Sequence, residues 1–116
     1  MTARQLKYSE ALREAQAQLL ASDPRVYLMG LGVPGPTGIF GTTSGLQEQF
    51  GADRVLDMPS SENGMTGVAL GTALMGRRPV LIHMRMDFAV LSMEPLVNQA
   101  AKWAYMYGAH IAPPYI

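Results

Sequence analysis

The sequence predicts an α/β fold of three layers with a mostly parallel sheet, and three observations support it. Short apolar runs alternate with longer amphipathic or glycine-spaced segments along the chain. Glycine, proline or charged residues bound each apolar run, as they do in buried strands. The 116 residues suit one domain, and a hydrophobic content of 48% supplies its core. We therefore expect strands joined by crossover helices, with ligands bound beyond the carboxyl ends of the strands.

The first elements are an amphipathic helix and a buried strand. Apolar residues at helical spacing predict a helix over residues 8–22, with Ser9 as its candidate N-cap. Pro24 ends that helix, because the residue before a proline avoids the helical region. The short apolar run "RVYLMG" predicts a strand at 25–30. The glycine- and proline-rich stretch 30–45 predicts a long loop inside the domain.

The middle of the chain repeats the alternation of helix and strand. The patterns predict a short helix at 44–51 and a strand at 53–58. A longer helix over 63–76 and a strand at 77–84 follow. The longer helix carries three glycines on roughly one face, where another backbone can approach closely. These glycines are Gly64, Gly67 and Gly71.

The last part of the chain predicts a helix over 87–108, interrupted or begun late because of Pro95. Residues 109–116 begin like a fourth strand. Because the sheet is expected to be parallel, its ligand side is formed by the loops after the first three strands. Those loops hold residues 30–43, 58–62 and 84–88.

Composition excludes several classes of protein. Nine basic and nine acidic residues balance, so the chain has no electrostatic footprint for nucleic acid or an anionic membrane. No cysteine is present, which excludes disulfides and thiolate chemistry. The polar N-terminus and the absence of a long apolar run predict a cytoplasmic protein. We predict no metal ligands: His83 is expected within a strand, and His110 at the surface or at a strand start.

Glu62 is the candidate functional residue, and two interpretations are open. It follows "DMPSS" at the end of a predicted strand, so it lies on the expected ligand side. Its position also suits a plain structural role, because Ser60 or Ser61 can cap the helix and a first-turn carboxylate favours the positive end of the helix dipole. The spacing alone does not choose between a helix start and a reactive carboxylate.

Residues 50–103 carry a resemblance to a known family. This stretch reads "FGADRVLDMPSSENGMTGVALGTALMGRRPVLIHMRMDFAVLSMEPLVNQAAKW". It resembles the pyrimidine-binding domain of the transketolase family, in the branch of the thiamin diphosphate-dependent 2-oxo acid dehydrogenases of the pyruvate type. The similarity is to the beta subunit of their first component, and it extends over roughly residues 8–112. The family pattern is kept at Pro59, Glu62, Gly64, Gly67, Gly71, Gly76, Arg78, Pro79, Asp87, Phe88, Asn98, Ala100, Ala101 and Lys102.

The resemblance implies a cofactor and two site residues. In that family the glutamate at the position of Glu62 hydrogen-bonds a ring nitrogen of the aminopyrimidine of thiamin diphosphate. That bond favours the imino tautomer, which lets the cofactor lose its thiazolium proton and attack a 2-oxo acid. Phe88 stands where the family has an aromatic that packs on the pyrimidine; a core aromatic after a strand is the alternative for this residue.

The sequence also departs from the family pattern. Leu91 replaces a polar residue, and Glu94-Pro95 replaces a helical pair. Leu31 and Gly32 stand where many relatives have acidic residues. The family's magnesium and diphosphate are held by a different domain that carries "GDG", a motif absent from these 116 residues. The family's later strands and its C-terminal domain have no counterpart here, so we expect residues 1–116 to form a single, incomplete pyrimidine-binding domain.

The expected function follows from that incompleteness. We expect a partial thiamin diphosphate pyrimidine-binding module that has no 2-oxo acid decarboxylase activity alone. It would depend on self-association, most simply as a two-fold dimer through the glycine-faced helix and the 88–106 helix, or on the alpha subunit of a 2-oxo acid dehydrogenase. The alternatives are a non-catalytic interaction module or stand-in subunit, and a gene fragment without a selected role. Whether the chain is an enzyme stays open at this stage.

Overall fold

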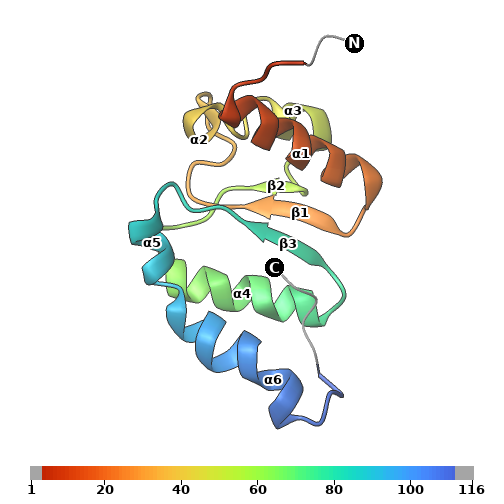
Figure 1. Cartoon of the computed structure of the whole chain (residues 1–116), viewed down its shortest axis with the longest axis vertical. Helices are drawn as coiled ribbons and strands as arrows, with labels where there is room; N and C mark the ends of the chain where they lie inside the picture. The colour runs from red at the N-terminus through yellow and green to blue at the C-terminus, as the bar shows by residue number, and fades with distance from the viewer. Residues whose placement is uncertain (1–3, 112–116) are drawn as a thin grey trace.

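The computed structural model describes residues 4–111, which form three layers (Figure 1). The middle layer is a sheet of β1 (Val26–Met29), β2 (Val55–Leu56) and β3 (Arg78–Leu81). One face of the sheet is covered by α1 (Tyr8–Ser22), α2 (Gly38–Gly41) and α3 (Leu46–Phe50). The other face is covered by α4 (Glu62–Leu74). The short helix α5 (Met86–Val90) lies at the end of the sheet beside the start of α4, and the π-helical segment η1 (Glu94–Ala100) and α6 (Ala101–Met106) lie beyond α4.

The sheet is parallel throughout, with β1 at its centre and the strand order β2-β1-β3. Leu28 of β1 is in register with Val55 of β2 and with Val80 of β3. All four residues of β1 are buried, as expected for a strand covered on both faces. The α/β class, the three layers and the parallel sheet are therefore confirmed.

The alternation of side chains along β1 divides the core into two clusters. Val26 and Leu28 point to the side of α1 and join the larger cluster, which also contains Leu20, Val33, Ile39, Leu46 and Val55. Tyr27 and Met29 point to the side of α4 and pack with Ala69. The central strand thus supplies apolar side chains to both layers.

The start of α1 differs from the prediction. Ser9 was expected to be the N-cap, but the helix begins at Tyr8 and its N-cap position is occupied by Lys7. The backbone N–H of Lys7 donates to the carboxylate of Glu10 at 3.0 Å. A carboxylate in the first turn therefore satisfies a backbone donor at this helix start, where the N-cap side chain is a poor acceptor.

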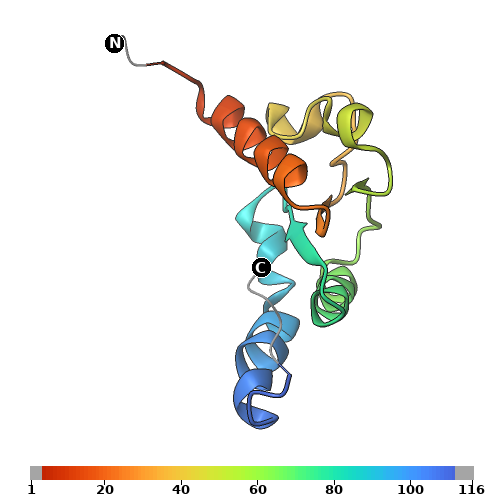
Figure 2. The same ribbon diagram turned by 90° about the vertical axis from the view of Figure 1, so that its right-hand side faces the viewer.

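The predicted helix over 87–108 forms three pieces. The chain breaks between α5 and η1 around Ser92, and Pro95 lies in the first turn of η1. A proline is tolerated in a first turn, because the N–H that it lacks would have no helical partner there. The predicted interruption is confirmed. Figure 2 shows the resulting arm, η1 and α6, extending away from the sheet past α4.

The predicted fourth strand does not form where the structure can test it. Residues 109–111 follow α6 as turns and bends, with Ala109 at a φ of 63° and the N–H of His110 donating to the carbonyl of Tyr107 at 3.1 Å. This hydrogen bond folds the chain back on α6 and prevents an extended backbone. The remaining residues of that expected strand, 112–116, lie outside the described part of the chain.

At two of the glycines of α4, no other described element of the chain makes the close approach that the spacing allows. A Cβ atom added at Gly67 or Gly71 would meet, within 4 Å, no atom of the described residues beyond its chain neighbours and the adjacent backbone of α4. By contrast, a Cβ at Gly30 would overlap the carbonyl oxygen of Ile82. Gly30 therefore allows the end of β1 to lie directly against Ile82, the residue that follows β3.

Candidate functional site

The loops at the carboxyl ends of β1 and β2 are joined by Asp57. Its carboxylate accepts hydrogen bonds from the backbone N–H of Gly32 at 2.7 Å and of Met58 at 2.9 Å. A single side chain therefore fixes the loop after β1 to the segment that leads into α4. This segment delivers Glu62 to the end of the sheet where ligands of parallel α/β folds bind.

Glu62 is the first residue of α4 and is only 9% exposed. Ser61 occupies the N-cap position but makes no side-chain cap hydrogen bond, so the expected capping by a serine side chain is wrong. The carboxylate lies in the first turn of α4, at the positive end of the helix dipole. Among residues 4–111, no side-chain hydrogen bond or ion pair involves this carboxylate.

A cluster of polar groups that the sequence did not reveal lies behind Glu62. The main-chain carbonyl of Glu62 accepts from the Thr66 hydroxyl at 2.6 Å and from the Ser92 hydroxyl at 3.4 Å. The two hydroxyl oxygens lie 2.8 Å apart, and Ser92 Oγ lies 3.4 Å from Nε2 of His83. Thr66 and Ser92 are both fully buried. His83 was expected within a strand, but β3 ends at Leu81 and His83 lies in the segment beyond it.

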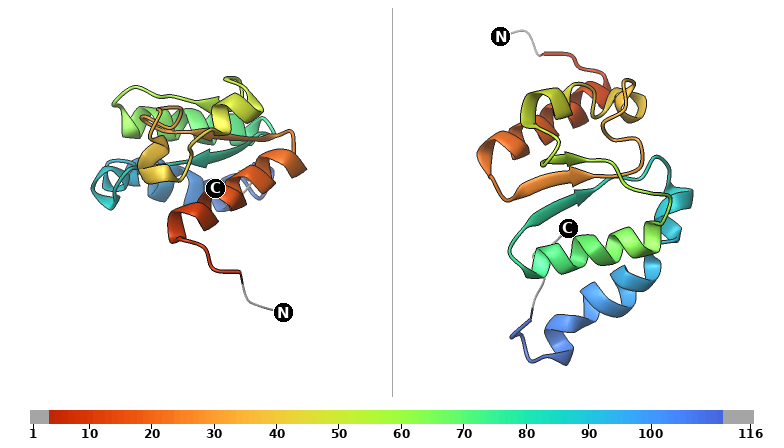
Figure 3. Two further views of the ribbon diagram at one scale, coloured as in Figure 1. Left: turned by 90° about the horizontal axis from the view of Figure 1, so that it is seen from above. Right: turned by 180° about the vertical axis from the view of Figure 1, so that it is seen from behind.

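Phe88 lies on α5, a short helix that ends close to the start of α4. Ser92, four residues further on, makes the contact with Glu62 described above, and the right-hand view of Figure 3 shows α5 at the end of the sheet where α4 begins. The Phe88 ring is half-buried and belongs to neither core cluster. The guanidinium carbon of Arg85 lies 5.2 Å from the ring centre, which is cation–π geometry.

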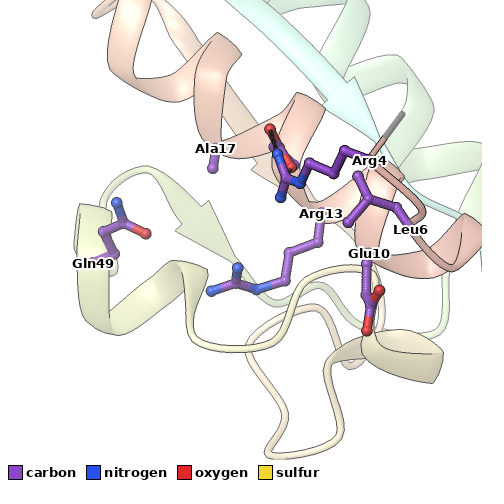
Figure 4. Close-up of a pocket in the computed structure, with 7 residues that line it drawn as sticks. Arg4, Leu6, Glu10, Arg13, Ala17 and Gln49 are labelled. Atoms are coloured by element: carbon purple, nitrogen blue, oxygen red, sulfur yellow. Dashed lines mark hydrogen bonds and ion pairs between the residues drawn. The ribbon is translucent and has the colours of Figure 1, made fainter. Parts of the chain in front are cut away.

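Three of the hollows on the described surface are lined by neither Glu62 nor Phe88. One, of about 440 Å³, lies at the ligand end of the sheet between the loop after β1 and Met84. A second, of about 290 Å³, lies beside β2 and α4 and is lined by Tyr27 and Arg77 among others. The third, of about 420 Å³, lies between α1 and α3 in the opposite layer, where Arg4 pairs with Glu14 at 2.9 Å (Figure 4).

The comparison with protein families decides the classification. The model of the family described as "Transketolase, pyrimidine binding domain" matches residues 4–115. The chain belongs to this family. In this pyrimidine-binding domain, Glu62 lies on α4 and Phe88 lies on α5. The hydrogen bond from Ser92, just after α5, to the carbonyl of Glu62 holds the two helices near each other.

Curated relatives of this pyrimidine-binding domain include three beta subunits of the pyruvate dehydrogenase E1 component. The subunit from Rickettsia bellii is 40% identical over 97% of this chain and 34% of its own length. That from Rhizobium meliloti is 38% identical over 92% of this chain and 23% of its own length. The mitochondrial beta-2 subunit of Oryza sativa subsp. japonica is 37% identical over 98% of this chain and 30% of its own length. The chain thus spans about a third or less of the length of these relatives.

Two further observations concern the described residues of this pyrimidine-binding domain. Within residues 4–111, no three histidine or carboxylate side chains are grouped as a metal ion would require. None of the helices in the same range combines the length and the apolar content that crossing a bilayer needs.

Proposed function

We propose that this chain forms the aminopyrimidine side of a thiamin diphosphate site, with Glu62 as its catalytic residue and Phe88 as a cofactor-binding residue. The diphosphate and magnesium would be held by a second polypeptide or domain. In this proposal the chain acts within a 2-oxo acid dehydrogenase assembly, beside an alpha subunit, and it does not turn over a 2-oxo acid by itself. Membership of the pyrimidine-binding family and the E1 beta relatives support the assignment.

The observation that carries the proposal is the environment of the Glu62 carboxylate. It is nearly buried at the ligand end of the sheet, yet no described residue of the chain hydrogen-bonds it. The Glu62 oxygens are not among the fully buried side-chain atoms that lack a partner, so they stay accessible to a ligand that supplies a hydrogen-bond donor. A protonated or N–H-bearing ring nitrogen is such a donor.

The Glu62 carboxylate, a hydrogen-bond acceptor, fits the aminopyrimidine half of thiamin diphosphate, which offers a ring nitrogen. The cofactor, when bound, supplies the electron sink for decarboxylation of a 2-oxo acid. In this proposal Glu62 holds a proton between its carboxylate and the ring nitrogen of the cofactor.

Phe88 fits less directly, because Arg85 already stacks on its ring. A pyrimidine can pack on Phe88 only on the face that Arg85 leaves free, or after Arg85 has turned toward solvent. Arg85 is exposed, so such a rotation exposes no buried group. The guanidinium would then be available at the rim of the site for a carboxylate, the group that 2-oxo acids carry.

A second candidate function is that of an interaction module without catalytic chemistry. It is favoured by the apolar side chains exposed along α5, η1 and α6. Val90 is 62% exposed, Leu91 56%, Val97 52% and Met106 59%. Exposed apolar side chains that follow one another along three neighbouring segments favour a surface that another chain covers. In this alternative the chain docks onto an alpha subunit and Glu62 has no ligand.

Calorimetry with thiamin diphosphate and magnesium separates the two candidates. The full chain would be titrated alone and in the presence of an E1 alpha subunit. We expect Glu62→Ala and Glu62→Gln to weaken cofactor binding by roughly 10- to 100-fold, as loss of a charge-assisted hydrogen bond predicts. The matched control is Glu48→Gln, because Glu48 is also a first-turn glutamate but is exposed on α3 in the opposite layer.

The outcomes are distinct. Equal cofactor affinity in the wild type and in Glu62→Ala would refute the assignment of Glu62. Co-purification with the alpha subunit that is unaffected by Glu62→Ala, with no cofactor bound by either form, would favour the interaction module.

A further inference from the structure

The buried hydroxyls of Thr66 and Ser92 form a link between parts of the chain that are distant in sequence. Thr66 lies one turn into α4, and Ser92 lies in the break between α5 and η1. Their oxygens are 2.8 Å apart, both residues are 0% exposed, and both hydroxyls reach the main-chain carbonyl of Glu62. His83, from the segment after β3, lies at the outer end of the link.

The link lies at the start of α4, where the usual side-chain hydrogen bond of an N-cap residue is missing. An N-cap side chain normally accepts a hydrogen bond from a first-turn N–H and so orients the helix end. Ser61 makes no such bond. The first turn is instead tied from the side, because Ser92 reaches the carbonyl of the very residue that carries the candidate carboxylate.

The arrangement has consequences for the direction of the Glu62 side chain. A carbonyl held by hydroxyls fixes its peptide plane, and that plane together with the preceding turn sets the Cα–Cβ direction. Each hydroxyl has one proton to donate, so the carbonyl, the other hydroxyl and His83 share these contacts. Removal of either hydroxyl therefore leaves a buried polar atom with fewer partners. Such atoms are costly in a dry interior, and the first turn would shift to find replacements.

We propose that Thr66 and Ser92 are positioning residues, which hold the first turn of α4 so that the Glu62 carboxylate faces its ligand, and that His83 completes the link. This inference rests on the proposed function for the identity of the ligand. It does not rest on it for the orientation of Glu62, which can be measured in the protein without any ligand. The link also couples α5, which carries Phe88, to the start of α4.

The test compares three variants of the full chain that each lose a hydroxyl with a fourth, Thr66→Ser, that keeps it. Thr66→Val and Ser92→Ala each remove one hydroxyl of the link. Thr72→Val is the matched control, because Thr72 also lies in α4, donates to the carbonyl of Ala69 at 2.8 Å and bonds the Tyr27 hydroxyl at 2.6 Å. All three lose a hydroxyl that joins α4 to another element, but only the first two lose it beside Glu62.

Three quantities would be measured: the thermal midpoint, the NMR resonance of the Glu62 side-chain carboxyl carbon without ligand, and the affinity for thiamin diphosphate with magnesium. We expect Thr66→Val and Ser92→Ala to shift the Glu62 resonance and to weaken cofactor binding about tenfold, as for one lost hydrogen bond. Thr72→Val should lower the thermal midpoint and leave the other two quantities unchanged. Thr66→Ser keeps the hydroxyl and should restore the wild-type resonance and affinity.

A Glu62 resonance that is unchanged in both link variants would overturn the positioning role, whatever the cofactor does. The positioning role also fails if Thr72→Val shifts that resonance equally, since the effect would then be general loosening of α4. If the wild type binds no thiamin diphosphate with or without an alpha subunit, the proposed function fails, and the ligand-free resonance still decides the inference. Ser92→Ala, a small change in a break between helices, keeps the test valid if Thr66→Val does not fold.

Discussion

At the scale of single residues, Asp23 shows how a few polar contacts fix the turn between α1 and β1. Its carboxylate accepts from the Arg25 side chain at 2.9 and 3.0 Å and from the Arg25 backbone N–H at 2.8 Å. Arg78, the first residue of β3, approaches it at 3.2 Å. These contacts, the Arg25 side chain first, lower the pKa of Asp23 from 3.8 to about 2.

A pKa that is lower in the folded state gives a pH dependence of definite sign. The contacts of ionised Asp23 stabilise the fold above the unfolded pKa of 3.8, and this stabilisation is lost as the pH falls from there through about 2. We expect Asp23→Asn to be less stable than wild type at neutral pH and the difference to shrink toward pH 2. Urea unfolding at a series of pH values measures this, with the exposed Asp53→Asn as the control. A gap between wild type and Asp23→Asn that is constant with pH would contradict it.

The residue scale is also where sequence reasoning reached its limit at the candidate site. Glu62 and Phe88 could be named because a family pattern surrounds them, although their roles stay predictions. Thr66 and Ser92 could not, because a threonine inside a helix and a serine between apolar residues are common and mean little alone. The only signal was that Thr66 lies four residues after Glu62, hence on the same face of the helix.

At the scale of elements, α4 carries the candidate residue Glu62 at its first position and two glycines in its interior. Gly67 and Gly71 lower its intrinsic stability, and no described residue packs in the space they leave. The glycine-faced surface therefore stays open for a second chain, as the expected dimer requires. Gly76, just beyond the helix, has a different reason for being glycine, since its φ is 88°.

Substitution of these glycines by alanine distinguishes the two reasons. Gly71→Ala should raise the free energy of unfolding of the dilute protein by up to ~1 kcal/mol, because alanine is the better helix former and meets no neighbour. Gly76→Ala should lower it by about 1 kcal/mol, because alanine is strained at positive φ. Denaturant unfolding at low protein concentration measures both. A destabilised Gly71→Ala would show that the open face is packed within the chain after all.

The elements themselves were predicted well where local pattern and burial agree. The helix over 8–22 was predicted with the bounds that α1 has, and each of the three strands lies inside its predicted range. The four-residue α2 was not predicted, because Ile39 and Phe40 take positive φ values of 37° and 57°, which apolar residues rarely adopt. Gly38 and the packing of Ile39 into the core impose that turn, and neither effect is visible in local sequence.

At the scale of the whole molecule, apolar surface is unevenly distributed. The side formed by α4 and the arm of η1 and α6 exposes Val68 at 50% and Val97 at 52%. Val68 lies on α4 and Val97 on η1, within the two predicted helices through which self-association was expected. The molecule is elongated, 49 × 33 × 26 Å, and the arm gives this side a large area for contact.

Charge placed on this side should prevent self-association. We expect Val68→Asp and Val97→Asp to shift the protein toward monomer, because a buried unpaired carboxylate is costly at an interface. Leu19→Asp is the matched control, since Leu19 is 46% exposed on α1 in the opposite layer. Light scattering over a range of protein concentrations measures the effect. A monomeric wild type at every concentration would argue against the proposed homo-oligomer.

Strand β1 has a consequence for how the domain loses its structure. Its four buried residues pack alternately against the layer of α1 and the layer of α4. Loss of one helical layer would remove the contacts on one face of β1 and expose the remaining cluster to water. We therefore expect both layers to unfold in a single cooperative step. A destabilising substitution in α1, far from Glu62, should then abolish ligand binding as effectively as one beside Glu62.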